Sequence, residues 1–268
     1  MIDIRIFHGK EAWIDGITDD FILAIAEIPV SRQPRFCLAG GQTPEPAYQV
    51  LSQLMVAGRA GQAPAILVPG DERVPGDERV PGNKRGPGNK RGLIGQPADL
   101  NATMLSRSFA KAIASGVANL YSWFDEETEG VAAGPGSASR VGSNLNPCND
   151  LAQAMIQTMK ARLAQLAFPG QPLFDLCYLG MGADGHTAGL FPGMPGLEDP
   201  GLCVRGLSPM PPRQRVSLGF SALVSTGKTR FIISASGKEA ALTRLRSSDP
   251  SCPAVMASTT DTIAFVLA

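Results

Sequence analysis

Short runs of apolar residues recur along the chain. Most of them are continuous rather than alternating, which is typical of strands that are covered on both faces. We therefore predict strands at six places, most of them buried. They are IDIRIF from Ile2, RFCLAG from Arg35, AILV from Ala65, FDLCYLG from Phe174, RFIISAS from Arg230 and TIAFVLA from Thr262.

The segments between these strands carry the period of a helix with one buried face. Apolar residues lie three to four positions apart over residues 13–28 and again over residues 151–166, and Gly170 is placed to end the second helix. Alternating strands and helices predict an α/β fold with a doubly wound, mostly parallel sheet and helices on both faces. A chain of 268 residues is long enough to form this fold as a single domain.

Two segments interrupt the pattern. Residues 130–146 (GVAAGPGSASRVGSNLN) contain almost no large apolar side chain, so we predict a flexible surface loop there. Residues 70–92 contain GDERVP twice in tandem, and GNKRG returns after six positions. A hexapeptide that is duplicated once is too short for a solenoid, and we therefore predict a loop with doubled segments.

The charge balance excludes several kinds of partner. The 24 basic and 24 acidic side chains cancel, and no basic run exceeds three residues, so we predict no binding to nucleic acid or to a membrane surface. No apolar stretch is long enough to span a membrane, and the N-terminal residues lack the apolar core of a signal peptide. An anionic ligand must then be held by local geometry.

The cysteines predict a reducing compartment and no metal centre. All five are scattered and none forms a C-x-x-C pair, so we expect reduced thiols in a cytoplasmic protein, with Cys37 and Cys177 as side chains of core strands. Zinc would need three or four ligands at short spacings. The sequence offers no such cluster, and we predict no metal site.

The first candidate site is the segment LAGGQTPEPAYQVL. A strand that ends near Leu38 runs into Gly40, Gly41, Gln42 and Thr43, and we expect Thr43 to cap a helix that has Pro44 at its first position. Paired glycines let the backbone approach a ligand, and the N–H groups at a helix N-terminus favour an anion such as phosphate. A tight turn that binds nothing remains the alternative.

The second candidate site is FDLCYLGMGADGHTAGLFPG, in which a buried strand is followed by Gly180, Gly182, Asp184, Gly185 and His186. In an open parallel sheet the ligand crevice lies at the carboxyl ends of the strands, where this turn would place Asp184 and His186. Histidine is the side chain best suited to move protons near neutral pH. The other histidine, His8, has no polar cluster around it in the sequence, and we predict that it is structural or exposed.

Further cations stand in positions that could serve an anionic ligand. Arg73, in Asp71-Glu72-Arg73, closely follows the strand AILV and could pair with a phosphate or with developing charge on a reacting oxygen. Arg215 stands at the start of a predicted strand, and Lys238 at a predicted helix N-terminus. Each of these residues has an alternative interpretation as an ordinary solvated surface charge.

The motifs GGQTP, DERVP, LGMGADGHTAGLFPG, RVSL and SGKEAAL occur in an order that resembles the 6-phosphogluconolactonases over nearly the whole chain. The resemblance implies a fold shared with the glucosamine-6-phosphate deaminases, a cytosolic place in the oxidative pentose phosphate pathway, and no metal or organic cofactor. It also implies three groups of site residues. The first is a ligand-binding loop of Gly40, Gly41, Gln42 and Thr43. The second is the active cleft with Asp71, Gly182 and three catalytic residues, which are His186, Asp184 as its support, and Arg73. The third is Arg215 and Lys238, which bind the phosphate.

Three features depart from the family pattern. The family often has Ser where Gln42 stands, and it has no counterpart of the loop at residues 130–146. Its asparagine, about twelve positions after the first aspartate of the DER segment, could be Asn83 or Asn89, depending on which GDERVP copy is used. Because the first copy directly follows a strand, we predict that Arg73 faces the site and that Arg79 faces solvent.

The resemblance implies hydrolysis of 6-phospho-D-glucono-1,5-lactone, with His186 as the base that activates water. A related isomerase or deaminase is the first alternative, but that chemistry uses a glutamate five positions after the histidine, where this chain has Phe191. The second alternative is a sugar-phosphate sensor. Such domains usually follow a helix-turn-helix, whereas this chain begins with its first strand. The expected partner is the small-molecule lactone, and the expected assembly is a monomer or a homodimer.

Overall fold

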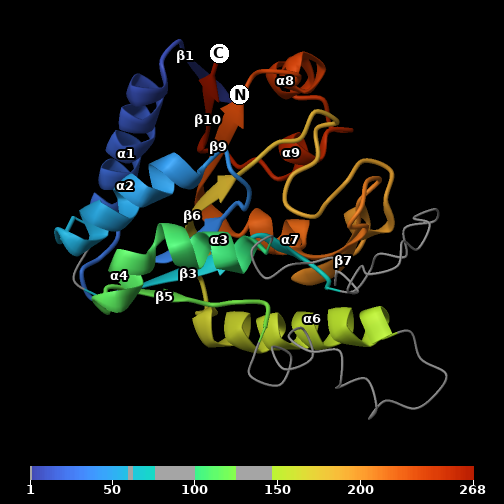
Figure 1. The fold of residues 1–268 in the computed structure, drawn as a ribbon, viewed down its shortest axis with the longest axis horizontal. Helices are drawn as coiled ribbons and strands as arrows, with labels where there is room; N and C mark the ends of the chain where they lie inside the picture. The colour runs from blue at the N-terminus through green and yellow to red at the C-terminus, as the bar shows by residue number, and fades with distance from the viewer. Residues whose placement is uncertain (1, 60–62, 76–99, 125–146) are drawn as a thin grey trace, which may run out of the picture.

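The computed structural model describes residues 2–59, 63–75, 100–124 and 147–268 (Figure 1). The predicted loop at 130–146 and the repeated segment after Pro75 lie outside these residues. Seven strands form one sheet in the order β1-β10-β9-β6-β2-β3-β5, and each neighbouring pair is parallel. Their bounds are β1 Asp3–Phe7, β2 Arg35–Leu38, β3 Ala65–Pro69, β5 Ala118–Leu120, β6 Phe174–Leu179, β9 Thr226–Ser234 and β10 Thr262–Leu267.

The continuous apolar runs are the central strands of this sheet, as predicted. Every residue of β2, β3 and β6 is buried, because helices cover both faces and neighbouring strands cover both edges. Cys37 and Cys177 are register partners on β2 and β6, and both are fully buried, which confirms their predicted place in the core.

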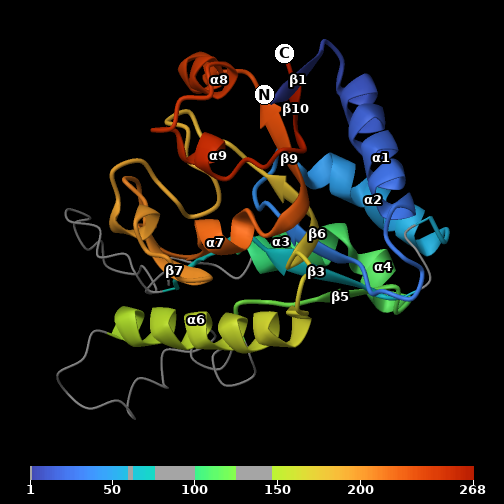
Figure 2. The same ribbon diagram turned by 180° about the vertical axis from the view of Figure 1, so that it is seen from behind.

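Helices pack on both faces of the sheet (Figure 1 and Figure 2). One face is covered by α1 Lys10–Ala26, α2 Glu45–Val56, α3 Asn101–Ser108 and α4 Ala110–Ala114, which share an apolar cluster with Leu38 and Tyr178. The other face is covered by α6 Pro147–Leu166, α7 Phe220–Leu223, α8 Glu239–Arg246 and α9 Pro253–Met256, which pack with Cys37 and Cys177. The predicted doubly wound fold is therefore confirmed.

A second, smaller sheet stands beside the carboxyl end of β3. It consists of β4 Asp71–Arg73, β8 Gln214–Leu218 and β7 Cys203–Leu207 in the order β4-β8-β7, and both pairs are antiparallel. Gly70 joins the two sheets: its N–H donates to the Leu38 carbonyl at 2.9 Å, and its own carbonyl accepts from the N–H of Leu218 at 2.8 Å. The prediction of a loop at residues 71–73 was wrong, because β8 pairs with this segment.

The remaining described elements add little to the site. A short 3-10 helix, Pro195–Leu197, precedes β7. Helix α6 ends at Leu166, and Gly170 adopts a φ of 75° in the turn that follows. No helix in the described part of the chain is long and apolar enough to cross a membrane.

Candidate active site

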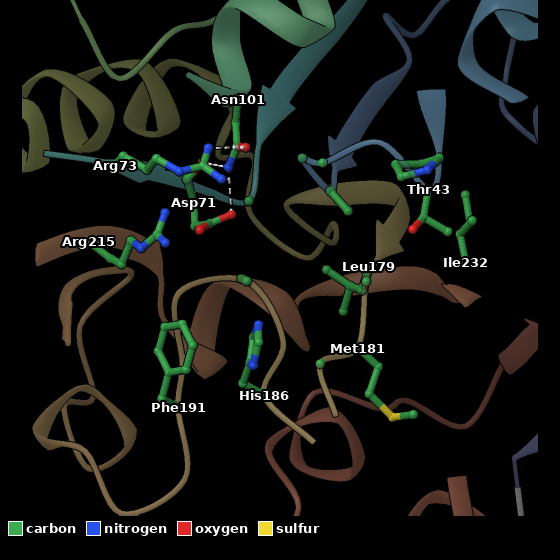
Figure 3. A pocket seen from close by; sticks show the side chains of 18 of the residues that line it. Thr43, Asp71, Arg73, Asn101, Leu179, Met181, His186, Phe191, Arg215 and Ile232 are labelled. Atoms are coloured by element: carbon green, nitrogen blue, oxygen red, sulfur yellow. Dashed lines mark hydrogen bonds between the residues drawn. The ribbon is translucent and has the colours of Figure 1, made fainter. Parts of the chain in front are cut away.

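A cavity of about 270 Å³ lies at the carboxyl ends of β2, β3, β6 and β9. From β2 the chain continues to β3 on one side, whereas β6 continues to β9 on the other, so the cavity stands where the strand order reverses. Nine of the eleven predicted site residues line it. They are Gly40, Gly41, Thr43, Asp71, Arg73, Gly182, His186, Arg215 and Lys238, and Figure 3 shows several of them converging from different elements.

His186 and Asp184 form a hydrogen-bonded pair in the turn after β6. The imidazole Nδ1 lies 2.6 Å from Oδ1 of Asp184, and the backbone N–H of His186 donates to the same oxygen at 3.0 Å. Gly182 makes room for this pair, because a Cβ at that position would lie 2.1 Å from the imidazole Nδ1. Asp184 thus supports His186 without lining the cavity itself.

The surroundings favour an ionised Asp184 beside the imidazole. Burial alone raises the pKa of Asp184, but the hydrogen bonds and the charge of His186 outweigh burial, and the net pKa lies below its ordinary value. A carboxylate on Nδ1 selects the tautomer with its proton there and leaves the lone pair on Nε2. On the other side, the ring of Phe191 packs against the imidazole, with ring centroids 4.2 Å apart at 34°.

Three cations among the residues that the structure describes line the cavity, although the chain as a whole carries no net charge. Arg73 on β4 and Arg215 on β8 are cross-strand register partners, so their side chains leave the small sheet on the same face. Lys238 directly precedes α8, and burial lowers its pKa. Asp71 is the one carboxylate among the described lining residues, so the cavity favours an anionic ligand.

Asn101 also lines the cavity, although its sequence context did not predict this. Its side-chain amide donates to the backbone carbonyl and to Oδ1 of Asp71, both at 2.9 Å, and its Oδ1 accepts from Arg73 at 3.3 Å (Figure 3). Asn101 lies thirty positions after Asp71, beyond the repeated segment, so the expected spacing of about twelve does not reach it. Asn83 and Asn89 lie outside the described residues. The signal that could have found Asn101 is its place at the start of the apolar-periodic helix α3.

Burial dominates the ionisation of Asp71. It raises the pKa of this carboxyl, and the neighbouring Arg215, Arg73 and His186 oppose the rise, as does the hydrogen bond from Asn101. In Figure 3 the Asp71 carboxylate and the Arg215 guanidinium point toward each other, and the His186 imidazole stands across the cavity from them. The arrangement places a proton acceptor opposite a group of cations.

The loop from Gly40 to Thr43 lines the cavity through part of its residues. A Cβ at Gly40 would lie 1.9 Å from Oδ1 of Asn101, so a larger residue there would displace the Asn101 side chain, and Gly41 adopts a left-handed φ of 88°. Gln42 is exposed and does not line the cavity.

The predicted cap at Thr43 was wrong. Helix α2 begins at Glu45, and Pro44, whose φ of −79° and ψ of −15° are already helical, occupies the capping position without a side-chain hydrogen bond. Thr43 therefore lies in the preceding turn, and it lines the cavity.

His8 takes no part in this site. It follows β1 at an edge of the sheet and is exposed, as predicted. Within the described ranges, no group of three or more His, Cys, Asp or Glu side chains could hold a metal ion.

Comparison with known proteins identifies relatives of the chain. A family model described as glucosamine-6-phosphate isomerases/6-phosphogluconolactonase matches residues 95–265. The chain is 43% identical to a 6-phosphogluconolactonase of Rattus norvegicus over 101 residues, which are 36% of this chain and 39% of the rat protein. It is 42% identical to a 6-phosphogluconolactonase of Pseudomonas putida over 86 residues, 30% of this chain and 35% of that protein. The chain thus spans less than two fifths of the length of these relatives.

Solved structures share the fold over its whole extent. The crystal structure of 6-phosphogluconolactonase from Leishmania guyanensis matches with a TM-score of 0.70 and 18% identity, covering 100% of this chain and 96% of that chain. A monomeric glucosamine-6-phosphate deaminase matches with a TM-score of 0.62 and 16% identity, covering 99% and 97%. These likenesses concern the fold, on which both activities occur. Because the family model covers more than half of its length, the chain belongs to the family of glucosamine-6-phosphate isomerases and 6-phosphogluconolactonases.

Proposed function

We propose that this protein hydrolyses 6-phospho-D-glucono-1,5-lactone to 6-phosphogluconate, as a cytoplasmic step of the oxidative pentose phosphate pathway. One observation carries the proposal: the His186–Asp184 pair stands across a cavity from Arg73 and Arg215. A base that can take a proton from water then faces cations that can hold a reacting oxygen and a phosphate. The names of the curated relatives support this activity.

In the proposed reaction, Nε2 of His186 accepts a proton from water while the water oxygen attacks the lactone carbonyl carbon. Asp184 holds the proton on Nδ1 and stabilises the imidazolium that forms. Arg73, together with backbone N–H groups, stabilises the negative charge on the carbonyl oxygen. When the tetrahedral intermediate collapses, the bond from carbon to the ring oxygen breaks, and the imidazolium returns its proton to that oxygen.

The phosphate of the substrate is assigned to Arg215 and Lys238, with the backbone of the Gly40–Thr43 loop beside the start of α2. These groups line the same cavity and supply two positive charges and N–H donors. Gly182 contributes by letting the imidazole lie close to the backbone. The expected monomer or homodimer stays a prediction.

The packing of Phe191 on His186 favours hydrolysis over isomerisation with deamination. A phenyl ring cannot transfer a proton, and it occupies the position at which the resemblance implies a glutamate in the deaminases. The apolar ring also screens one side of the imidazole from water. A hydrolase needs only the one base and the oxyanion donors, which the described residues supply.

Turnover of 6-phosphogluconolactone, corrected for its spontaneous hydrolysis, tests the proposal. We expect His186→Ala to lower kcat by about 10²–10⁴-fold with little change in KM, the usual contribution of a general base. His8→Ala is the matched control, because His8 is exposed and outside the cavity, and it should keep wild-type rates. Activity should also survive dialysis against a strong chelator. A wild-type protein no faster than buffer, or one that releases ammonia from glucosamine-6-phosphate, would refute the proposal.

A further inference from the structure

Glu72 is a fully buried carboxylate directly behind the cavity, and the proposed reaction gives it no part. It lies on β4 between Asp71 and Arg73, and alternate side chains of a strand point to opposite faces. Asp71 and Arg73 line the cavity, whereas Glu72 faces away from it and is 0% exposed. A charge at such a position needs strong partners, because burial of an unpaired carboxylate is unfavourable.

The partners of Glu72 are backbone N–H groups from two elements. Its Oε1 accepts from the N–H groups of Arg73 and Asn101, both at 2.9 Å, and its Oε2 accepts from Ala102 at 2.8 Å. Asn101 and Ala102 begin α3, and Leu100, which precedes them, provides no side-chain cap. The carboxylate of Glu72 therefore caps α3 from a neighbouring strand, where a negative charge is favourable.

Burial disfavours the charged form of this carboxyl. It raises the pKa of Glu72 to about 7, although the three backbone N–H groups favour the charged form and oppose the rise; the nearby Asp71 adds to it.

The first turn of α3, which Glu72 holds, carries a side chain of the cavity. The amide of Asn101 contacts Asp71 and Arg73, and its Oδ1 fills the space that a side chain at Gly40 would need. A shift of α3 would therefore move Asn101 away from Arg73 and from Gly40. The connection runs from the buried carboxylate, through the helix start, to the cation that faces the substrate.

We propose that Glu72 is a positioning residue for Arg73: its carboxylate ties β4 to the first turn of α3, so that Asn101 can orient the Arg73 guanidinium toward the cavity. The inference rests on the proposed function, because Arg73 is assigned there to the reacting oxygen. Glu72 itself touches no substrate. Its effect on the reaction is geometric and requires the reach of a glutamate.

Two conservative variants separate the effect of the length of the Glu72 side chain from the effect of its charge. Glu72→Asp keeps the charge but is one methylene too short to bind Arg73 and both N–H groups of α3 together, and Glu72→Gln keeps the length but replaces one acceptor by an NH₂ group. We expect each to lower kcat for 6-phosphogluconolactone by about 10- to 100-fold with a small change in KM, the scale of a misplaced oxyanion donor. In the double variant Glu72→Asp with Arg73→Ala, kcat should be no lower than in Arg73→Ala alone.

Asp175→Asn is the matched control for a loss of stability. Asp175 is buried and accepts from the backbone N–H of Arg35 at 2.9 Å, but it lies at the amino end of β6, on the opposite edge of the sheet from the cavity. It should lower Tm comparably and leave kcat within about twofold. Asn101→Ala keeps the backbone N–H groups that Glu72 binds and gives a second test, with the same expected loss of kcat, if the Glu72 variants fold poorly.

The outcomes distinguish this inference from the proposed function. A wild-type protein without turnover refutes the proposed function. An active wild-type protein whose Glu72 variants or Asn101→Ala keep normal kcat refutes the positioning role. A fully active Glu72→Asp together with an impaired Glu72→Gln also refutes it, because the charge and not the length of the side chain would then matter. The positioning role is likewise refuted if kcat of the double variant Glu72→Asp with Arg73→Ala is lowered by the product of the two single losses.

Discussion

Asp71 and Arg73 lie two residues apart on β4, so both side chains leave the strand on the face that lines the cavity. Asn101 contacts both of them, which fixes the carboxylate and the guanidinium relative to each other. At the scale of single residues, the site is therefore a set of side chains that hold one another as well as the ligand. The removal of one member changes the geometry of the others.

Arg73→Ala should lower kcat by about 10²-fold or more, the scale of a lost oxyanion donor. The matched control is Arg79→Ala, which removes the corresponding arginine of the second GDERVP copy and should leave kcat near the wild-type value. Arg79 lies outside the described residues, so steady-state kinetics is the direct test of the two copies. The reverse pattern would move the assignment to the second copy. Wild-type kcat in both variants would leave the oxyanion to backbone N–H groups alone.

At the scale of elements, six of the seven described strands of the large sheet could be predicted from their composition, and so could β8 of the small sheet. β2, β3 and β6 are buried on both faces, so their composition alone separates them from the rest of the chain. The same sequence signal placed Asp184 and His186 at the carboxyl end of β6. The segment SGKEAAL separately placed Lys238 directly before a helix.

The pairing of β4 in the small sheet and the exact start of α2 could not be predicted in the same way. β4 is three residues long and contains only charged side chains, so its strand character comes from its pairing with β8, which is distant in the sequence. β5 is equally short and partly exposed. The contact between Asn101 and Asp71 was missed because the repeated segment separates them, and spacing rules do not survive an insertion.

The two ends of that insertion are anchored independently of its length. Before it, the N–H of Val74 donates to the carbonyl of Gln214 at 3.1 Å, and after it, Asn101 and Ala102 donate to Glu72. The entropic cost of closing a loop depends only weakly on its length and rises by roughly 0.6 kcal/mol for each doubling. The site should therefore tolerate a shorter connection between Pro75 and Leu100.

Deletion of residues 76–87 tests this expectation, since it removes one copy of GDERVP and one of GNKRGP. We expect kcat/KM for the lactone to stay within about twofold and Tm to stay equal or to rise slightly, because a shorter loop loses less entropy on folding. A variant with residues 76–87 replaced by glycine and serine is the control for length. A tenfold or larger loss in both variants would place the duplicated residues in the site.

At the scale of the whole molecule, attraction of the substrate depends on where the charges lie rather than on how many there are. The 24 positive and 24 negative side chains give no net charge, yet three cations and one carboxylate of the described residues line the cavity. Long-range attraction of a phosphorylated ligand is therefore weak, and recognition is left to contacts within the cavity.

Arg215→Ala should accordingly raise KM for the phosphorylated lactone and have a much smaller effect on unphosphorylated gluconolactone. The comparison is made by steady-state kinetics on the two substrates, with the unphosphorylated lactone as the internal control. An equal loss on both would mean that Arg215 supports the small sheet or the reacting carbonyl, and the phosphate would then have to be held elsewhere.

The register of the small sheet has a consequence for the evolution of this protein. Arg73 and Arg215 stand directly opposite each other on β4 and β8, and like charges at such positions oppose strand pairing. The Asp71 carboxylate, which interacts with both guanidinium groups, offsets part of this repulsion, so Asp71 helps to keep the two arginines together. Selection for heat resistance alone would favour the replacement of one of them and would produce a sturdier but less active protein. Thermostable descendants of this chain should therefore gain their stability far from β4 and β8.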